Sequence, residues 1–165
     1  MTDTILVPVD FSAITDAVVQ QAARFGRALN ARLELIHVIT PEQIQSAWAE
    51  ADSLPWFGPV IIGEPTSLEP AQEEVVSAAL QAERDRLQQY QEDLEAEGLK
   101  VRGRIALGDT PAGKICEEAK SSRASLIVMG SHGHGALYHL LMGSVSEGVI
   151  NRAPCPVLVV PPGKK

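Results

Sequence analysis

The sequence predicts an α/β fold, in which the strands of a parallel sheet alternate with helices. Short apolar, β-branched runs recur from residue 4 to residue 160, and such runs are typical of strands buried on both faces. Longer segments between them repeat apolar residues at helical spacing. The length of 165 residues is near the usual size of one domain, so we expect a single domain over residues 1–165.

The first unit is predicted to be strand, helix and strand. Residues 4–9 are a continuous apolar run, and Asp10 and Ser12 follow it and can open a helix. Residues 33–38 form the second strand. The helix between them has one apolar face, at spacings of 4, 3 and 4 residues: Val18, Ala22, Phe25 and Leu29.

The alternation fails over residues 40–69, which we expect to form a long surface excursion. Residues 44–51 can make a short helix, but two prolines and a glycine in residues 54–59 cannot continue it. Both tryptophans, Trp48 and Trp56, fall in this stretch. Their simplest role is to pin the excursion onto the domain, and a binding role is the alternative.

The second half of the chain supplies the remaining elements. Pro70 suits the first turn of a long polar helix, and Gly98 suits the residue just past its end. The strand at 101–107 alternates apolar and polar residues, so we expect it to have one solvent-exposed face and to lie toward an edge of the sheet. We expect helices at 69–97, 111–121 and 144–151, and strands at 101–107, 125–129 and 156–160.

Charge and cysteine usage exclude several classes of protein. The chain has 21 acidic and 14 basic residues and no basic cluster, so we expect no nucleic-acid partner. No apolar run approaches the roughly 18 residues that span a bilayer, and the acidic start is unlike a signal peptide. Cys116 and Cys155 form neither a disulfide framework nor a zinc motif. These features predict a cytoplasmic protein without a membrane partner.

Residues 108–115 nearly match the phosphate-loop pattern GxxxxGK[ST]. The last position should carry a hydroxyl for Mg²⁺, but it is Ile115. Pro111 also suggests that the helix starts before Gly113, which places Gly113 and Lys114 in its first turn. We therefore favour a capped turn, with Asp109 or Thr110 as cap, that carries an exposed Lys114.

A stronger candidate begins directly after the strand at 125–129. Glycines allow close backbone approach, so amides in residues 129–135 can point at one anion. Nine residues separate Gly133 from residues 143–146, which open a helix and add the hydroxyl donors Ser144 and Ser146. The dinucleotide pattern GxGxxG is not matched, because Tyr138 stands where the third glycine should be.

The spacing Gly130, two residues, Gly133, nine residues, Gly143-Ser144 resembles the ATP-binding branch of the universal stress protein family. The resemblance extends along nearly the whole chain, through residues 5–12, residues 37–38 and residues 154–160. It explains nothing in the excursion at 40–69.

The resemblance implies a Rossmann-like fold: a five-stranded parallel sheet in order 3-2-1-4-5 with helices on both faces. It implies ATP, AMP or ADP as ligand, with Mg²⁺. Asp10 would lie toward the ribose or a phosphate-bound Mg²⁺, and Val38 would offer backbone groups to the adenine edge. The implied nucleotide-binding residues are Pro8, Val9 and Asp10 under the nucleoside; Val38; Met129, Gly130, Ser131, His132, Gly133, His134 and Gly135 around ribose and phosphates; and Gly143, Ser144, Val145 and Ser146 at the phosphate tail.

Some of these residues can serve another purpose. Asp10 can cap the following helix without any ligand. His132 and His134 can bind a metal as an HxH pair, but no third ligand is suggested by spacing, so we favour loop residues near phosphate. His37 and His139 are interpreted as structural.

The last strand predicts how the chain assembles. Pro156, Val157, Leu158, Val159 and Val160 are all apolar, and the family order places them at an edge of the sheet. A bare apolar edge must be paired, covered or charged. Pairing with the same strand of a second chain gives a symmetric homodimer, as the resemblance also implies. The rival is a monomer in which residues 48–65 fold over the edge.

Three functions follow. The first is a dimeric stress-response or signalling protein whose state depends on an adenine nucleotide. The second is a slow ATPase or an adenylate-forming enzyme of the same architecture. The third is a dimeric interaction module without nucleotide dependence. The sequence offers no paired carboxylates in the loop and no base held by a third group, so catalysis beyond slow ATP turnover is not expected and no catalytic residue is assigned.

Overall fold

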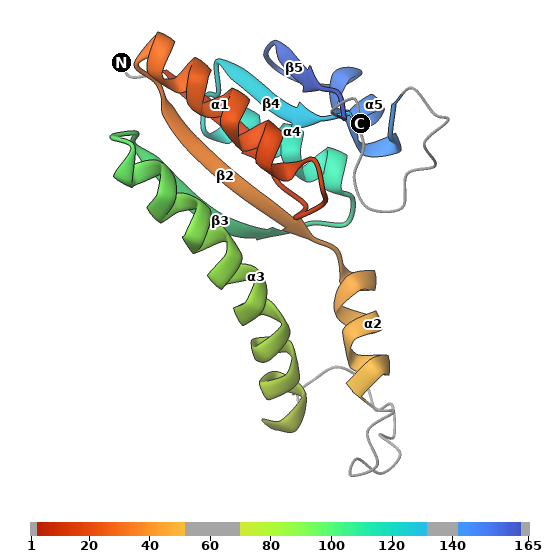
Figure 1. Cartoon of the computed structure of the whole chain (residues 1–165). Coiled ribbons are helices and arrows are strands. Elements are labelled where there is room, and N and C mark those ends of the chain that lie inside the picture. The colour runs from red at the N-terminus through yellow and green to blue at the C-terminus, as the bar shows by residue number, and fades with distance from the viewer. Residues whose placement is uncertain (1–2, 52–69, 132–141, 163–165) are drawn as a thin grey trace.

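The computed structural model describes residues 3–51, 70–131 and 142–162. The strands are β1 (Thr4–Pro8), β2 (Arg32–Ile39), β3 (Val101–Leu107), β4 (Leu126–Gly130) and β5 (Val157–Val160). The helices are α1 (Thr15–Leu29), α2 (Pro41–Ala51), α3 (Pro70–Ala96), α4 (Pro111–Ser121) and α5 (Ser144–Ile150). The strands form one parallel five-stranded sheet in order β3-β2-β1-β4-β5 (Figure 1), which confirms the predicted fold class and strand order.

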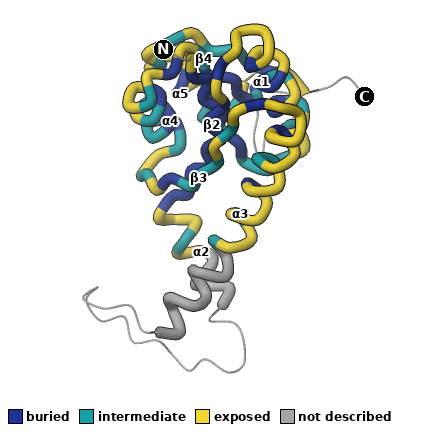
Figure 2. The backbone as a smooth tube through the Cα atoms, turned by 90° about the vertical axis from the view of Figure 1, so that its left-hand side faces the viewer, coloured by how far each residue is buried: buried dark blue, intermediate teal, exposed yellow. Residues whose placement is uncertain are grey.

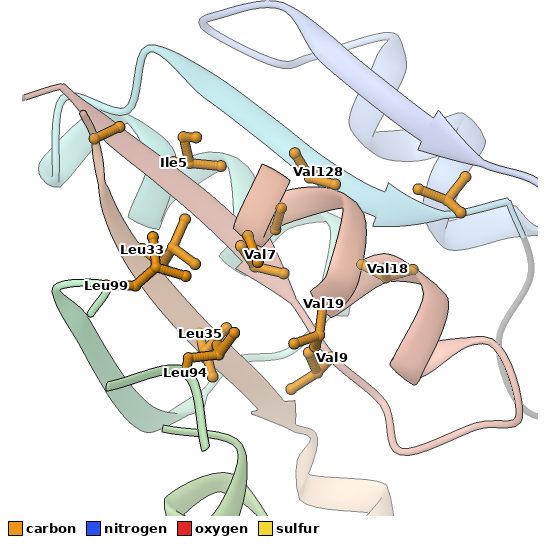
Figure 3. Close-up of a cluster of buried hydrophobic side chains, with 14 of the residues drawn as sticks. Ile5, Val7, Val9, Val18, Val19, Leu33, Leu35, Leu94, Leu99 and Val128 are labelled. Carbon is orange, nitrogen blue, oxygen red and sulfur yellow. The ribbon is translucent and has the colours of Figure 1, made fainter. Parts of the chain in front are cut away.

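Each face of the sheet carries its own apolar cluster, because side chains alternate between the faces along a strand. Ile5 and Val7 of β1 pack on one face with α1 and α3 (Figure 3). Leu6 packs on the other face with α4 and α5. The central strands are therefore buried between two helical layers, whose outer surfaces are exposed (Figure 2).

The buried face of α1 differs from the predicted stripe. Phe25 and Leu29 are 37% and 50% exposed. The face that meets the sheet is turned toward smaller residues: Thr15, Val18, Val19, Ala22, Ala23 and Gly26. A Cβ at Gly26 would lie 3.0 Å from Leu33 Cδ2. The helix thus approaches the sheet closely, and this leaves the larger Phe25 and Leu29 at the rim of the contact.

The start of α2 lies three residues earlier than predicted, directly after β2. Thr40 and Gln43 form a capping box: the Thr40 N–H donates to Gln43 Oε1 at 2.9 Å, and the Gln43 N–H donates to Thr40 Oγ1 at 3.4 Å. Figure 1 shows α2 beside the first half of α3, both extending away from the sheet. Residues 52–69, with Trp56, and the side chain of Trp48 lie outside the described part, so the predicted packing of the tryptophans stays a prediction.

The strand β3 forms one edge of the sheet, as its alternating pattern predicted. The second half of α3 runs along it, and Gln91 Oε1 accepts a hydrogen bond from the Gly103 N–H at 2.8 Å. A Cβ at Gly103 would lie 2.9 Å from Leu87 Cγ, so glycine permits this close approach of α3. Among the described residues, no helix is long and apolar enough to cross a membrane.

Candidate functional site

The two halves of the glycine motif meet at the carboxyl end of β4. The Gly143 N–H donates to the Ser131 carbonyl at 2.7 Å, and the Ser131 N–H donates to the Val160 carbonyl of β5 at 2.9 Å. Ser146 Oγ donates to the carbonyls of Gly130, at 2.8 Å, and Ser131, at 3.1 Å. The turn that opens α5 is therefore held against the residues that follow β4.

The two serines of α5 differ in what they can offer a ligand. Ser146 is 3% exposed, and its one hydroxyl hydrogen points at backbone carbonyls, which differs from the expectation of a phosphate donor. Ser144 is exposed at the first residue of the helix. Ser146 supports the framework of the site, while Ser144 lies at the surface, where a ligand can reach its hydroxyl.

The end of β1 lies beside the end of β4, since the two strands are paired. The chain order reverses between them: β2 and β3 lie on one side and β5 on the other. In open α/β sheets ligands bind outside the carboxyl ends of the strands at this reversal. The predicted site residues Pro8, Val9 and Asp10 and the predicted Met129, Gly130 and Ser131 therefore share one end of the sheet.

Asp10 orders the turn between β1 and α1. Its Oδ1 accepts hydrogen bonds from the Ser12 N–H at 3.1 Å, from Ser12 Oγ at 2.7 Å and from Thr15 Oγ1 at 3.2 Å. The N-cap residue of α1 is Ile14, so Asp10 caps the turn rather than the helix itself. The orientation of its carboxylate is fixed by this turn.

Val38 faces the same region through its backbone. The Val9 N–H donates to the Ile36 carbonyl at 2.9 Å, so the backbone groups of Ile36 point toward β1. Backbone direction alternates along a parallel strand, and Val38, two residues further, points the same way. Because β1 ends at Pro8, these groups lie where the chain leaves the sheet. His37 donates from Nδ1 to the Val9 carbonyl at 2.8 Å and is buried, which fits its structural interpretation.

The remaining predicted residues divide into two groups. Met129 is buried in the second apolar cluster, and the half-buried Val145 packs against it. His132, Gly133, His134, Gly135 and His139 lie outside the described residues, and the HxH alternative lies there too. Within residues 3–51, 70–131 and 142–162, no group of three or more His, Cys, Asp and Glu side chains is placed to hold a metal ion.

Comparison with known proteins identifies a family whose model matches most of the chain. The family model described as the universal stress protein family matches residues 1–55 and 61–161. The chain belongs to the universal stress protein family. The match covers every described strand and helix.

Individual members of the universal stress protein family resemble the chain over nearly its full length. Universal stress protein MJ0577 of Methanocaldococcus jannaschii is 31% identical over 156 residues, which are 94% of this chain and 93% of that protein. Its solved structure matches with a TM-score of 0.76 at 27% identity, covering 100% of this chain and 99% of that chain.

Two further solved structures hold adenine nucleotides. A universal stress protein in complex with cAMP matches with a TM-score of 0.61 at 21% identity, covering 98% of both chains. The universal stress protein from Archaeoglobus fulgidus in complex with dAMP matches with a TM-score of 0.60 at 20% identity, covering 95% of this chain and 96% of that one. At these identities the likeness concerns the fold.

The near-match to a phosphate loop is a helix start in this family member. The helix α4 begins at Pro111 with Thr110 at the N-cap position, as predicted, but the Thr110 side chain makes no capping hydrogen bond. The prediction of an exposed lysine was wrong. The Lys114 side chain is 18% exposed, and its Nζ lies 3.0 Å from Glu118 Oε1 and 3.2 Å from Glu117 Oε2. These spacings of three and four residues along the helix could have predicted the ion pairs.

Sequence reasoning also missed a cluster around Phe11. Its ring lies 4.8 Å from that of His37 and 6.3 Å from that of Tyr90, measured between centroids. Arg86 Cζ lies 5.3 Å from the Phe11 centroid. The partners on α3 stand more than 70 residues away in sequence, and no local spacing signals such a contact.

Proposed function

We propose that this universal stress protein family member binds an adenine nucleotide, ATP or AMP/ADP, with Mg²⁺ where a phosphate tail is present. It acts as a homodimer in stress response or signalling. One observation carries the proposal: the halves of the glycine motif meet at the carboxyl end of β4, beside the end of β1. The 2.7 Å hydrogen bond from Gly143 to Ser131 joins them.

The geometry supports an anion at this position. Gly130 and Gly143 have no side chains to block the approach of a phosphate to the backbone. Ser144 adds an exposed hydroxyl, and Ser146 holds the turn in place through its hydrogen bond to the Gly130 carbonyl. The carboxylate of Asp10, oriented by Ser12 and Thr15, lies at the same end of the sheet and suits a ribose hydroxyl or a phosphate-bound Mg²⁺.

The adenine base is assigned to the end of β2. The Val38 backbone points toward the place where β1 leaves the sheet, and backbone N–H and C=O groups can pair with the polar edge of a purine. The family members solved with cAMP and dAMP carry an adenine nucleoside with a single phosphate. Their ligands support adenine as the recognised base and leave the number of phosphates to measurement.

Homodimerisation is proposed through β5. The edge at β3 is covered by α3, whereas β5 is paired on one side to β4. The carbonyls of Pro156 and Val160 accept hydrogen bonds from β4, so alternation directs the backbone groups of Val157 and Val159 to the open edge. A second copy of β5 would pair with them about a two-fold axis.

The first test is direct identification of the ligand. Protein purified without added nucleotide is denatured, and released small molecules are identified by mass. Calorimetric titration then compares Mg-ATP, AMP and cAMP on the stripped protein. We expect saturable binding of at least one adenine nucleotide, and weaker binding of the matching guanine nucleotide. No binding of any of these nucleotides would leave the interaction module as the better description.

A variant within the proposed site is compared with a control variant outside it. Gly143→Val adds a side chain where a phosphate would approach, and we expect it to abolish measurable binding. Ser125→Ala is the control, since Ser125 lies at the amino end of β4, where its hydroxyl bonds the Thr4 carbonyl at 3.2 Å. We also expect little ATP hydrolysis: the amount of product released should not substantially exceed the amount of nucleotide bound to the protein. Turnover near the enzyme median of roughly 10 per second would favour the enzyme instead.

A further inference from the structure

The turn that carries Asp10 contains a residue in an unusual conformation. Phe11 has a φ of +57°, in the left-handed region that glycine favours and a bulky side chain rarely adopts. This conformation redirects the chain immediately after Asp10. Residues in such conformations persist where their surroundings hold them, and they gather at ligand-binding turns.

The surroundings that hold Phe11 come largely from α3. The Tyr90 ring is stacked on the Phe11 ring, with 18° between their planes, and the Arg86 guanidinium lies over the same ring. The Tyr90 hydroxyl donates to Asp16 Oδ1 on α1 at 2.5 Å. Tyr90 therefore ties α3 both to Phe11 and to the first turn of the helix that follows it.

The Phe11 ring is also linked to the sheet. The His37 ring packs against Phe11 at 40° between planes, and its Nδ1–H donates to the carbonyl of Val9. Val9 and Asp10 directly precede Phe11. The contacts from α3 and β2 thus converge on the segment to which the nucleoside is assigned.

The protonation state of Tyr90 agrees with a fixed hydroxyl. Burial, followed by the hydrogen bond to Asp16, raises the pKa of Tyr90 to about 12. A tyrosine hydroxyl is already protonated at physiological pH, and this shift extends its role as a donor to more alkaline solution.

We propose that Arg86 and Tyr90 are positioning residues for the nucleotide-binding turn: by packing on Phe11 they hold its left-handed conformation and so set the orientation of Val9 and Asp10. They act through Phe11 and do not touch the nucleotide. The proposal rests on the proposed function for its consequence on affinity, but the order of the turn can be measured without any ligand.

The test uses the double variant Arg86→Gln/Tyr90→Leu, which removes both the cation and the stacked ring from Phe11 and keeps an apolar side chain at position 90. The control is Arg84→Gln, the same change at an exposed position on α3. The first readout is amide hydrogen exchange of Ser12, whose N–H donates to Asp10 Oδ1 within the turn. The second is the calorimetric affinity for Mg-ATP and for AMP.

We expect Ser12 exchange to be about tenfold faster, and nucleotide affinity about threefold to tenfold weaker, in the double variant than in the control. The single variant Arg86→Lys, which keeps a cation over the ring, should stay near the wild type. A merely structural role would lower the melting temperature while leaving Ser12 exchange and affinity at control values, and that result overturns the proposal.

Failure of the proposed function gives a different pattern. If the wild type binds no adenine nucleotide, affinity cannot be measured, and Ser12 exchange alone decides whether α3 positions the turn. Faster exchange in the double variant upholds the positioning of the turn by α3, and exchange equal to that of Arg84→Gln refutes it.

Discussion

The hydroxyl of Ser146 donates to the carbonyl of Gly130 at 2.8 Å, across 16 positions of sequence. It links the first turn of α5 to the last residue of β4. Because Ser146 is buried, this hydrogen bond is shielded from water. If the hydroxyl were removed, water could not readily replace it as a donor to the carbonyl. The buried Ser146 therefore supports the structure of the site, whereas Ser144 is exposed and can be reached by a ligand.

Ser146→Ala is expected to destabilise the protein by about 1–3 kcal/mol, since the carbonyls of Gly130 and Ser131 lose their side-chain donor. Urea unfolding followed by circular dichroism measures the change. Ser125→Ala, which removes a hydroxyl from the other end of the same strand, should change stability by less than about 0.5 kcal/mol. Equal effects of the two variants on the free energy of unfolding would mean that the buried Ser146 hydrogen bond stabilises the fold no more than an exposed one.

Ser144→Ala is expected to leave stability nearly unchanged and to weaken nucleotide binding. Losing one hydrogen bond to a charged phosphate costs roughly 1.5–3 kcal/mol, or about one to two decades in the dissociation constant. Lys114→Ala is the comparison, because Lys114 pairs with Glu117 and Glu118 instead of lying in a phosphate cradle. Calorimetry on both variants separates the sites. A larger loss of affinity in Lys114→Ala would favour residues 108–115 as the phosphate-binding loop, against our interpretation.

The ion pairs around Glu118 predict a specific response to acid. Arg104 Nη2 of β3 lies 2.5 Å from Glu118 Oε2, and Lys114 Nζ lies 3.0 Å from Oε1. The hydrogen bond from Arg104, opposed by burial and helped by Lys114, lowers the pKa of Glu118 to about 2. The folded state therefore binds this proton less readily than the unfolded state.

Ionised Glu118 therefore stabilises the folded state at neutral pH. A depressed folded-state pKa gives stability that is present above the unfolded pKa of about 4.5 and is lost as the pH falls toward 2. We expect Glu118→Gln to be less stable than the wild type by roughly 2–3 kcal/mol at pH 7, and the gap to close by pH 2. Glu117→Gln is the matched control, since Glu117 is 68% exposed and also pairs with Lys114. A gap that persists unchanged at pH 2 would rule out this linkage.

The sequence predicted the fold well because strand signals and family resemblance agreed. Buried runs such as residues 4–9 and 33–38 differ little from the strands observed, and Gly98, with a φ of +83°, lies just past the end of α3 as expected. The stripe on α1 was wrong at Phe25 and Leu29 because periodicity counts apolar side chains, whereas close packing on the sheet selects small ones.

The candidate site was predictable only in part. The resemblance placed Gly130 and Gly143 in one site, and their segments are in contact. The direction of the Ser146 hydroxyl and the packing of Tyr90 on Phe11 depend on distant segments meeting, which residue spacing does not encode. His132 and Gly133 lie outside the described residues, so their predicted contacts with phosphate stay predictions.

The proposed dimer depends on the open edge of β5. The side chains of Val157, Leu158 and Val159 are each half-buried in the single chain. Their backbone alternates, so Val159 directs its N–H away from β4 while the Val160 carbonyl accepts from the Ser131 N–H. A proline at 159 would remove that outward donor without breaking the ladder to β4.

We therefore expect a wild-type dimer at micromolar concentration, and mostly monomer for Leu158→Lys and for Val159→Pro. Leu158→Lys puts two like charges together across a two-fold axis, and Val159→Pro removes a hydrogen-bond donor from the shared edge. Leu107→Lys is the control, because Leu107 lies on the opposite edge strand and is 60% exposed. Light scattering gives the mass, and circular dichroism checks that each variant is folded. A monomeric wild type, or folded variants at 158 and 159 that both stay dimeric, would show that the chains do not meet through β5.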